Sequence, residues 1–291
     1  MQNRKGIVLA GGNGSRLYPL TNSISKQLLP IYNKPMIYYS LSTLMLSGIQ
    51  EILIITQSHF IPLFKNLLKD GSHLGLSISY KAQDVPAGIA EAFIIGEDFI
   101  GKDNVALILG DNIFYGSELN SQLIKASKSN DITLFACTVS NPNQFGVFKY
   151  DKKSPVSIIE KPQIAPSNDA VTGLYFYDNE VCKIAKSLKK SERGELEITD
   201  LNNYYLKNKK VLINKLSRET LWLDTGTFEN LQQCSQIIYS IEKNTNIMIG
   251  CIEEISLKQG WIKIENLNDL LKKYGKNEYS NYLYNLTDGN Y

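Results

Sequence analysis

Residues 6–17 read GIVLAGGNGSRL, a short apolar run that leads directly into a glycine-rich turn. The apolar run is typical of a buried strand, and the glycines permit positive φ and leave space beside the backbone N–H groups. Such open amides can surround the oxygens of a polyphosphate. Arg16 adds a planar guanidinium, and Lys26, in the segment SKQLLP at 25–30, adds a compact ammonium. The stretch predicts the first strand of an α/β sheet followed by a phosphate-binding loop.

Two better-known phosphate motifs do not fit this loop. A dinucleotide-binding fingerprint needs a third glycine where Leu17 stands, and a P-loop ends in Gly-Lys followed by Ser or Thr. The other reading of the segment is an exposed tight turn. The two nearby cations favour the phosphate reading.

Composition narrows the class of protein. A chain of 291 residues with 43% hydrophobic content can bury a large core, and a net charge of +2 without a run of five like charges argues against nucleic-acid or membrane binding. The first residues lead into a strand and not into a signal peptide, so we expect a cytoplasmic enzyme. The four cysteines lack CxxC spacing and predict free thiols, and two histidines give little support to a zinc site or a Ser-His-Asp triad.

The first half of the chain alternates strand-like and helical patterns. Strand-like runs lie at 6–10, 51–56, 77–81, 105–109 and 133–139, and helical spacing lies at 36–47, 63–68, 87–99 and 118–129. This alternation predicts a Rossmann-like, mixed but mostly parallel sheet with helices on both faces. Ligands of such sheets lie beyond the carboxyl ends of the strands, so the loops after Ala10 and Leu109 should border one site.

The pattern changes after about residue 140. Residues 145–150 and 156–161 flank a polar turn and predict a β-hairpin, a strand follows at 171–177, and the chain is mainly helical from Glu229 onward. We therefore divide the chain into an α/β core at 1–228, with parts at about 1–140 and 141–228, and a C-terminal helical region at 229–291 that serves packing, assembly or regulation.

Two acids follow strand-like segments in settings that suit a divalent cation. Asp111 follows the run at 105–109, and Asp224 lies between Trp222 and the turn at Gly226. Magnesium binds hard oxygen ligands and often uses one or two carboxylates together with substrate phosphates. The alternative is that each aspartate caps a turn; spacing alone does not decide between them.

Three further positions are candidate ligand contacts. Alternation places Glu160 and Lys161 on opposite faces of the hairpin strand unless Pro162 or a bulge bends it. A carboxylate there can accept sugar hydroxyl protons and an ammonium can hold a phosphate, whereas the ordinary alternative is a surface ion pair. Gln83, before the turn Pro86-Ala87-Gly88, can read a base edge because an amide both donates and accepts; the alternative is an exposed loop.

Together these motifs resemble those of the glucose-1-phosphate thymidylyltransferases, a group within the sugar nucleotidyltransferases. The resemblance is carried in order by GGNGSRLYPLT at 11–21, SKQLLP at 25–30, LGDNIFYG at 109–116, EKP at 160–162, GELEITD at 194–200 and WLDTG at 222–226. It implies a nucleotidyltransferase fold with a sugar-binding hairpin part. It also implies Mg²⁺-dependent transfer from dTTP to α-D-glucose 1-phosphate, which gives dTDP-glucose and pyrophosphate on the way to dTDP-rhamnose or related deoxysugars.

The resemblance also implies roles for individual residues. Arg16, Lys26 and Lys161 would be catalytic, and Asp111 and Asp224 would bind Mg²⁺. The nucleotide site would comprise Leu9, Gly11, Gly12, Gly14, Ser15, Arg16, Gln27, Gln83, Pro86, Gly88 and Asp111. The sugar-phosphate site would comprise Asn112, Gly146, Glu160, Lys161 and Val171.

Departures from the family pattern concern selectivity and regulation. Phe145 stands where many relatives have tyrosine, and Glu91 where they often have glutamine; we interpret the second change as tolerable. A second site for a dTDP-sugar effector would use Tyr115, Gly116, Arg218 and Cys251, while Ser117 and Ile252 depart from it. A homotetramer is expected from the resemblance. Thymine and uracil share the edge that Gln83 would read, so UTP, or another hexose 1-phosphate, remains an alternative substrate.

Overall fold

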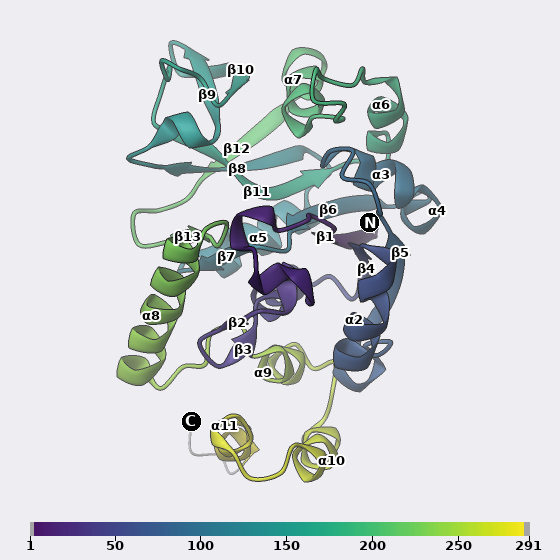
Figure 1. Ribbon diagram of the computed structural model, residues 1–291, viewed down its shortest axis with the longest axis vertical. Helices are drawn as coiled ribbons and strands as arrows, with labels where there is room; N and C mark the ends of the chain where they lie inside the picture. Colours follow the sequence, from purple (N-terminus) through teal and green to yellow (C-terminus); the bar gives the residue numbers. More distant parts are fainter. Residues whose placement is uncertain (1–2, 288–291) are drawn as a thin grey trace.

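A nine-stranded mixed sheet forms the centre of the computed structural model, which describes residues 3–287 (Figure 1). Its main path runs β10-β9-β11-β6-β1-β4-β5, and β8 and β12 continue from β11. The strands of this sheet are β1 (Arg4–Ala10), β4 (Glu51–Thr56), β5 (Ser77–Ala82), β6 (Asn104–Leu109), β8 (Ile132–Thr138), β9 (Gly146–Asp151), β10 (Ser154–Glu160), β11 (Asp169–Tyr177) and β12 (Val211–Lys215). Two small sheets pair β2 (Pro30–Ile31) with β3 (Lys34–Pro35), and β7 (Asn112–Tyr115) with β13 (Leu221–Asp224).

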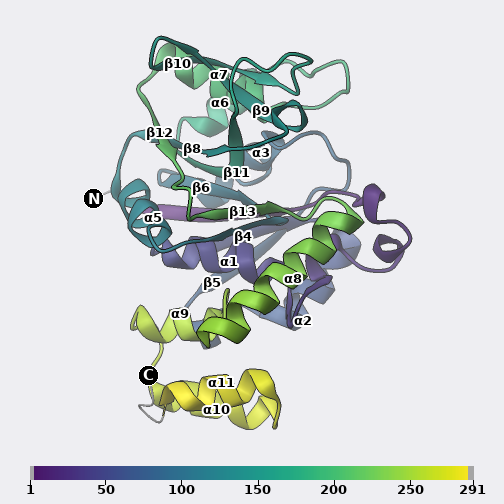
Figure 2. The same ribbon diagram turned by 90° about the vertical axis from the view of Figure 1, so that its left-hand side faces the viewer.

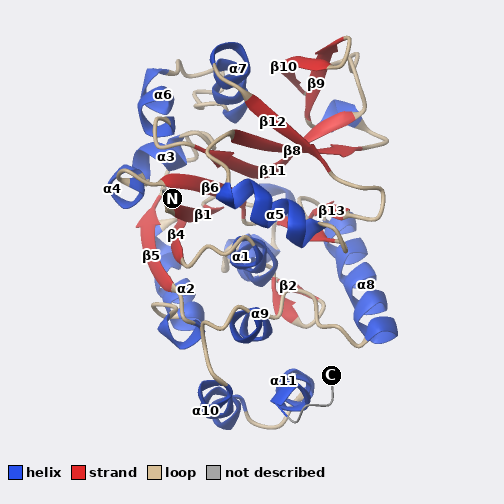
Figure 3. Cartoon of the chain, turned by 180° about the vertical axis from the view of Figure 1, so that it is seen from behind, coloured by secondary structure: helices blue, strands red, loops and turns tan. Residues whose placement is uncertain are grey.

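The helices flank this sheet on both faces. They are α1 (Ile37–Leu46), α2 (Ile61–Leu68), α3 (Glu91–Ile95), α4 (Glu97–Ile100), α5 (Leu119–Lys128), α6 (Val181–Ser187), α7 (Ile198–Asn208), α8 (Phe228–Thr245), α9 (Ile252–Lys258), α10 (Ile264–Tyr274) and α11 (Glu278–Thr287). Seen from behind, α6 and α7 lie on one side of the central strands and α1, α2 and α9 on the other (Figure 3). The predicted fold class is confirmed.

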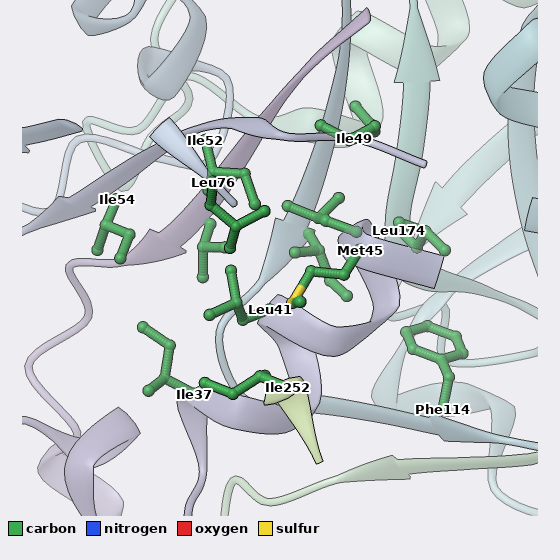
Figure 4. Close-up of a cluster of buried hydrophobic side chains, with 14 of the residues drawn as sticks. Ile37, Leu41, Met45, Ile49, Ile52, Ile54, Leu76, Phe114, Leu174 and Ile252 are labelled. Atoms are coloured by element: carbon green, nitrogen blue, oxygen red, sulfur yellow. The ribbon is translucent and has the colours of Figure 1, made fainter. Parts of the chain in front are cut away.

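The parallel part of the sheet is held in register along β1. Ile7 is opposite Leu53 of β4 and Leu107 of β6, and all three are fully buried beneath α3, α6 and α7. Alternate residues of the same strands point to the other face, where Ile52 and Ile54 of β4 pack against Ile37, Leu41 and Met45 of α1 (Figure 4). Because both faces are buried, the central residues of these strands are continuously apolar.

The antiparallel strand β11 is the main departure from a parallel sheet. It lies between β6 and β8 and pairs antiparallel with both, so β8 does not contact β6 as a neighbour in the sheet. The pairing of β11 with β8 shifts in register between Val171 and Tyr175, in the segment that contains Gly173. The sequence also predicts one helix over 87–99, but the structure has the separate helices α3 and α4, which meet at Gly96, and α7 was not predicted at all.

The C-terminal helices attach through buried polar contacts as well as apolar ones. Lys34 Nζ donates to Glu242 Oε1 of α8 at 2.7 Å, and Tyr274 Oη donates to Glu253 Oε1 of α9 at 2.7 Å. Figure 2 shows α10 and α11 side by side beneath α9. Ile252 of α9 belongs to the core cluster under the sheet, so α9 is continuous with the α/β core. The domain division at residue 228 stays a prediction.

Two smaller expectations concern cysteines and membranes. All four cysteines are free thiols, as predicted, and three of them are buried. Within residues 3–287, no helix combines the length and the apolar character that crossing a bilayer requires.

Candidate active site

The glycine-rich loop after β1 turns sharply at Gly14. Gly14 has φ of +59° and precedes the 3-10 turn Ser15–Leu17, and its carbonyl accepts a hydrogen bond from Thr21 Oγ1 at 2.9 Å. A Cβ at this position would lie 2.7 Å from the Thr21 side chain, so conformation and space both require glycine. Gly12 is exposed and a Cβ there would meet nothing, which leaves the backbone of the loop open to a ligand.

Lys26 joins this loop region to the end of β6. Its side chain is only 6% exposed, and Nζ lies 2.6 Å from Asp111 Oδ2. The end of β1 also contacts Gly110, whose N–H donates to the Leu9 carbonyl at 2.9 Å, while Gln27 packs over Gly110. The loops after β1 and β6 therefore border one site, as parallel strand ends do.

Asp111 remains ionised because its partners outweigh its burial. Burial raises the pKa of the carboxyl, but the Lys26 charge and hydrogen bonds from Lys26 and Asn112 lower the pKa below its ordinary value overall. Asn112 Nδ2 donates to Asp111 Oδ1 at 3.0 Å. Asn112 Oδ1 in turn accepts from Trp222 Nε1 at 2.7 Å and from the Gly173 N–H at 3.0 Å. The Asn112 amide thus fixes the Asp111 carboxylate, because the amide is itself held by hydrogen bonds from β13 and β11.

Asp224 lies at the end of β13, opposite Asn112 of β7. The next residue, Thr225, donates from its N–H and its Oγ1 to the Asp111 carbonyl, which keeps the two aspartates adjacent. Burial raises the pKa of Asp224, and the Asp111 charge raises it further, while Lys26 and Arg16 oppose the shift. Asp111 and Asp224 therefore form a pair of mutually repelling carboxylates that a cation between them would stabilise.

Arg16 reaches from the glycine loop to the end of β13. A Cβ placed on Gly226 would lie 2.7 Å from Arg16 Nη2 and 3.1 Å from Asp224 Oδ1. The guanidinium thus occupies the space beside Asp224 that a side chain at 226 would fill. The site combines two carboxylates with two cations, Arg16 and Lys26, at one edge of the sheet.

The strand end at Glu160 and Lys161 does not alternate as a regular strand would. Lys161 has φ of +42°, and its N–H donates to the Phe145 carbonyl at 3.0 Å, so the chain turns at this residue. Both side chains consequently line the same cleft, contrary to simple alternation. Glu160 Oε2 accepts a hydrogen bond from Thr199 Oγ1 of α7 at 2.6 Å, which fixes the carboxylate.

A cleft of about 270 Å³ brings together Arg16 and all the residues expected at the sugar phosphate and the metal. Eight of the predicted residues line it: Arg16, Asp111, Asn112, Gly146, Glu160, Lys161, Val171 and Asp224. Three further residues that were not predicted also line it and hold Asn112 and Glu160: Gly173, Thr199 and Trp222. Thr199 lies within the GELEITD motif and Trp222 within WLDTG. Their roles were not predicted because their hydrogen-bond partners, Glu160 and Asn112, are remote in sequence.

The turn at residues 86–90 contacts Gln83, whose Nε2 donates to the Gly88 carbonyl at 3.3 Å, and Pro86 is exposed on this turn. Gly88 has φ of +103°, and the turn is held by hydrogen bonds from Leu196 N to Ala87 O at 2.7 Å and from Ala90 N to Leu196 O at 3.2 Å. Gln83 is only 6% exposed, and its Oε1 lies 2.8 Å from the position of a Cβ on Gly11. Gln83 is therefore a fixed, buried side chain and not part of an exposed loop.

Sequence comparison identifies the family. The family model described as nucleotidyl transferase matches residues 5–240, which is most of the chain and includes every element of the cleft. The chain belongs to the nucleotidyl transferase family.

Relatives of this nucleotidyl transferase extend over nearly its whole length. A glucose-1-phosphate thymidylyltransferase of Neisseria meningitidis is 51% identical over 284 residues, which cover 97% of this chain and 99% of the relative. One of Mycobacterium tuberculosis is 48% identical over 287 residues, which cover 98% of this chain and 100% of the relative.

Solved structures agree with this assignment. A Bacillus anthracis protein assigned as a glucose-1-phosphate thymidylyltransferase, crystallised with sucrose, superposes with a TM-score of 0.74 at 40% identity. The superposition covers 80% of this chain and 94% of that chain. A UDP-glucose pyrophosphorylase in complex with UDP-glucose superposes with a TM-score of 0.72 at 25% identity, covering 82% of this chain and 99% of the other.

The residues suggested for an effector site lie in two places in this nucleotidyl transferase. Tyr115 is the last residue of β7, and Gly116, which follows it, packs against Thr220. Arg218 is exposed in the loop that contains Thr220 and leads into β13. Cys251 is buried in a separate apolar cluster with Met248, Leu267 and Leu283. Their regulatory role stays a prediction.

The opposite pKa shifts of the two aspartates predict opposite stability effects of their removal in metal-free protein at neutral pH. The lowered pKa of Asp111 means that its charge stabilises the fold above its unfolded pKa, and this contribution is lost as pH falls through the folded value. Asp111→Asn should lower the free energy of unfolding by about 2 kcal/mol, because Lys26 loses its charged partner.

The raised pKa of Asp224 means that its charge costs stability at neutral pH; this cost decreases as pH falls through the folded pKa and is gone below the unfolded pKa. Asp224→Asn should therefore raise the free energy of unfolding at neutral pH, and the gain should shrink in acid. Urea unfolding with a chelator present measures both variants. A loss of stability in Asp224→Asn at neutral pH would contradict the assignment of charges.

Proposed function

We propose that this enzyme transfers the thymidylyl group of dTTP to α-D-glucose 1-phosphate and releases pyrophosphate. The observation that carries the proposal is the cleft in which Arg16, Asp111, Glu160, Lys161 and Asp224 converge from separate elements. Relatives 48–51% identical over nearly the whole chain are glucose-1-phosphate thymidylyltransferases, which supports this choice of substrates. The glycine loop would bind the triphosphate, and the part of the cleft near Glu160 would bind the sugar phosphate.

The two aspartates fit a Mg²⁺ site. Within residues 3–287 no group of three or more histidine, cysteine or carboxylate side chains is placed so that it could hold a metal ion by itself. Magnesium commonly binds through only one or two carboxylates and completes its shell with water and substrate phosphates. Asp111 and Asp224 would hold the ion, which when bound neutralises and aligns phosphate oxygens of the two substrates.

The residues of the chain perform positioning and charge neutralisation. An oxygen of the sugar phosphate attacks the α-phosphorus, one P–O bond forms, and the bond to the β-phosphate oxygen breaks as pyrophosphate leaves with the electron pair. A phosphate monoester is already largely ionised near neutral pH, so no general base is required. Lys161 would hold the attacking phosphate, and Arg16 and Lys26 would stabilise charge on the transferred and leaving groups.

Selection of the sugar would depend on Glu160 and the aromatic pair beside it. Glu160 is oriented by Thr199, so its free lone pairs are fixed toward the cleft, where a carboxylate can accept from sugar hydroxyls. Phe145 and Trp222 pack with ring centroids 5.1 Å apart at the border of the cleft. Phe145 carries no hydroxyl, which removes one polar contact at this border and predicts looser sugar selectivity.

The decisive experiment supplies the purified enzyme with glucose 1-phosphate and either dTTP or UTP and measures pyrophosphate release. We expect dTDP-glucose with Mg²⁺, no turnover after chelation, and recovery when Mg²⁺ is added back. The likeness to a UDP-glucose pyrophosphorylase makes UTP the relevant competitor. A higher kcat/KM with UTP would replace the proposed nucleotide, and the absence of any nucleoside diphosphate sugar would refute the proposed reaction.

The role of Lys161 is tested by Lys161→Ala. Loss of a charge-assisted contact of about 1.5–3 kcal/mol should raise KM for glucose 1-phosphate by about 10- to 100-fold, with little change in KM for dTTP. Lys153→Ala, in the exposed turn of the same hairpin, is the matched control and should behave like wild type. An unchanged KM for the sugar phosphate in Lys161→Ala would remove Lys161 from this role.

A further inference from the structure

The side-chain amide of Gln83 is held in one orientation by Glu91. Gln83 Nε2 lies 2.6 Å from Glu91 Oε2 and 3.3 Å from the Gly88 carbonyl oxygen. A carboxylate and a carbonyl can only accept hydrogen bonds, so the group that faces them must be the NH₂ of the amide. Turning the amide over would place two acceptors 2.6 Å apart without a proton between them.

The opposite end of the amide consequently points toward the glycine loop. Gln83 Oε1 lies 2.8 Å from the place where a Cβ on Gly11 would stand, at the start of the loop after β1. Gln83 is buried, which leaves its amide little freedom to reorient. The nucleotide side of Gln83 is therefore a hydrogen-bond acceptor.

Glu91 itself is fixed by the fold. It is the first residue of α3 and lies between Ala90 and Ala92, both of which are fully buried in the core. The Ala90 N–H donates to the Leu196 carbonyl, which ties the start of the helix to the segment before α7. The backbone at Glu91 is thus fixed by packing and hydrogen bonding, and its carboxylate accepts the hydrogen bond from Gln83.

We propose that Glu91 is a positioning residue that selects the nucleobase by presenting Gln83 as an acceptor. The inference rests on the proposed function, because it takes Gln83 to be the residue that meets the base. An acceptor at this point suits pyrimidines with an imide N3–H, which are thymine and uracil. Cytosine places an acceptor at N3, so it would face the Gln83 oxygen without a proton to share. This arrangement favours binding of dTTP and UTP over dCTP, and it does not distinguish thymine from uracil, which lacks the methyl group.

The test compares kcat/KM for dTTP and dCTP at saturating glucose 1-phosphate in wild type and Glu91→Gln. A glutamine at 91 can donate as well as accept, so it no longer forces one orientation of Gln83, and only the 3.3 Å contact with the Gly88 carbonyl still favours the original one. We expect the dTTP-to-dCTP ratio to fall by about fivefold or more, the factor that corresponds to one neutral hydrogen bond. KM for glucose 1-phosphate should not change, because Glu91 contacts the nucleotide side of the site, through Gln83. This value is a control, since a general loss of structure would alter the use of both substrates.

A swapped pair separates orientation from mere contact. In the double variant Gln83→Glu with Glu91→Gln, the carboxylate at 83 is an acceptor on both sides, so the ratio should recover even if kcat falls. Glu97→Gln, on the adjacent helix and paired with Lys186 at the surface, is the matched control and should keep the wild-type ratio.

The possible outcomes are distinct. An unchanged ratio in Glu91→Gln, with dTTP turnover retained, overturns the role of Glu91. Equal use of dTTP and dCTP by the wild-type enzyme overturns it as well, and this comparison decides the matter if the Glu91→Gln variant fails to fold. Failure of the wild type to form any nucleoside diphosphate sugar refutes the proposed function instead.

Discussion

The buried ion pair between Lys26 and Asp111 is the constraint on which the site depends. It joins the segment after the glycine loop to the end of β6 at 2.6 Å, with the lysine almost completely removed from solvent. Removing either partner would leave an uncompensated charge in a poorly solvated place, which destabilises the fold. Asn112 links this ion pair to two other elements. Its Nδ2 donates to Asp111, and its Oδ1 accepts hydrogen bonds from Trp222 Nε1 and from the Gly173 N–H.

The arrangement exchanges some stability for affinity toward charged ligands. Asp224 is held beside Asp111 by the hydrogen bonds of Thr225. Burial, and then the Asp111 charge, raise the pKa of Asp224, so its ionised form lowers the stability of the fold. A cation and two phosphate substrates would relieve this repulsion and neutralise Arg16 and Lys26 at the same time. Under the proposed function such a site would bind its charged ligands together more readily than singly, and preorganised charges of this type are an efficient means of transition-state stabilisation.

Local patterns were sufficient to predict the parallel strands, the glycine loop and the acids at the strand ends, because each depends on a few adjacent residues. Contacts between distant segments were not predictable in the same way. Tertiary packing determines that β11 lies between β6 and β8. It also determines the hydrogen bond that Thr199 donates to Glu160. The turn at Lys161 needs a positive φ in a residue that rarely adopts it, and Glu91 acquires its significance only from its contact with Gln83.

The central claim is that Lys26, held by Asp111, supplies charge stabilisation to the transfer step. Single-turnover formation of dTDP-glucose by Lys26→Gln, at saturating Mg²⁺ and substrates, tests it most directly. The account predicts a rate lower by about 100-fold or more, the effect of losing one preorganised electrostatic contact in an active site. A rate close to that of the wild type would contradict the account, because the ion pair would then serve the fold alone.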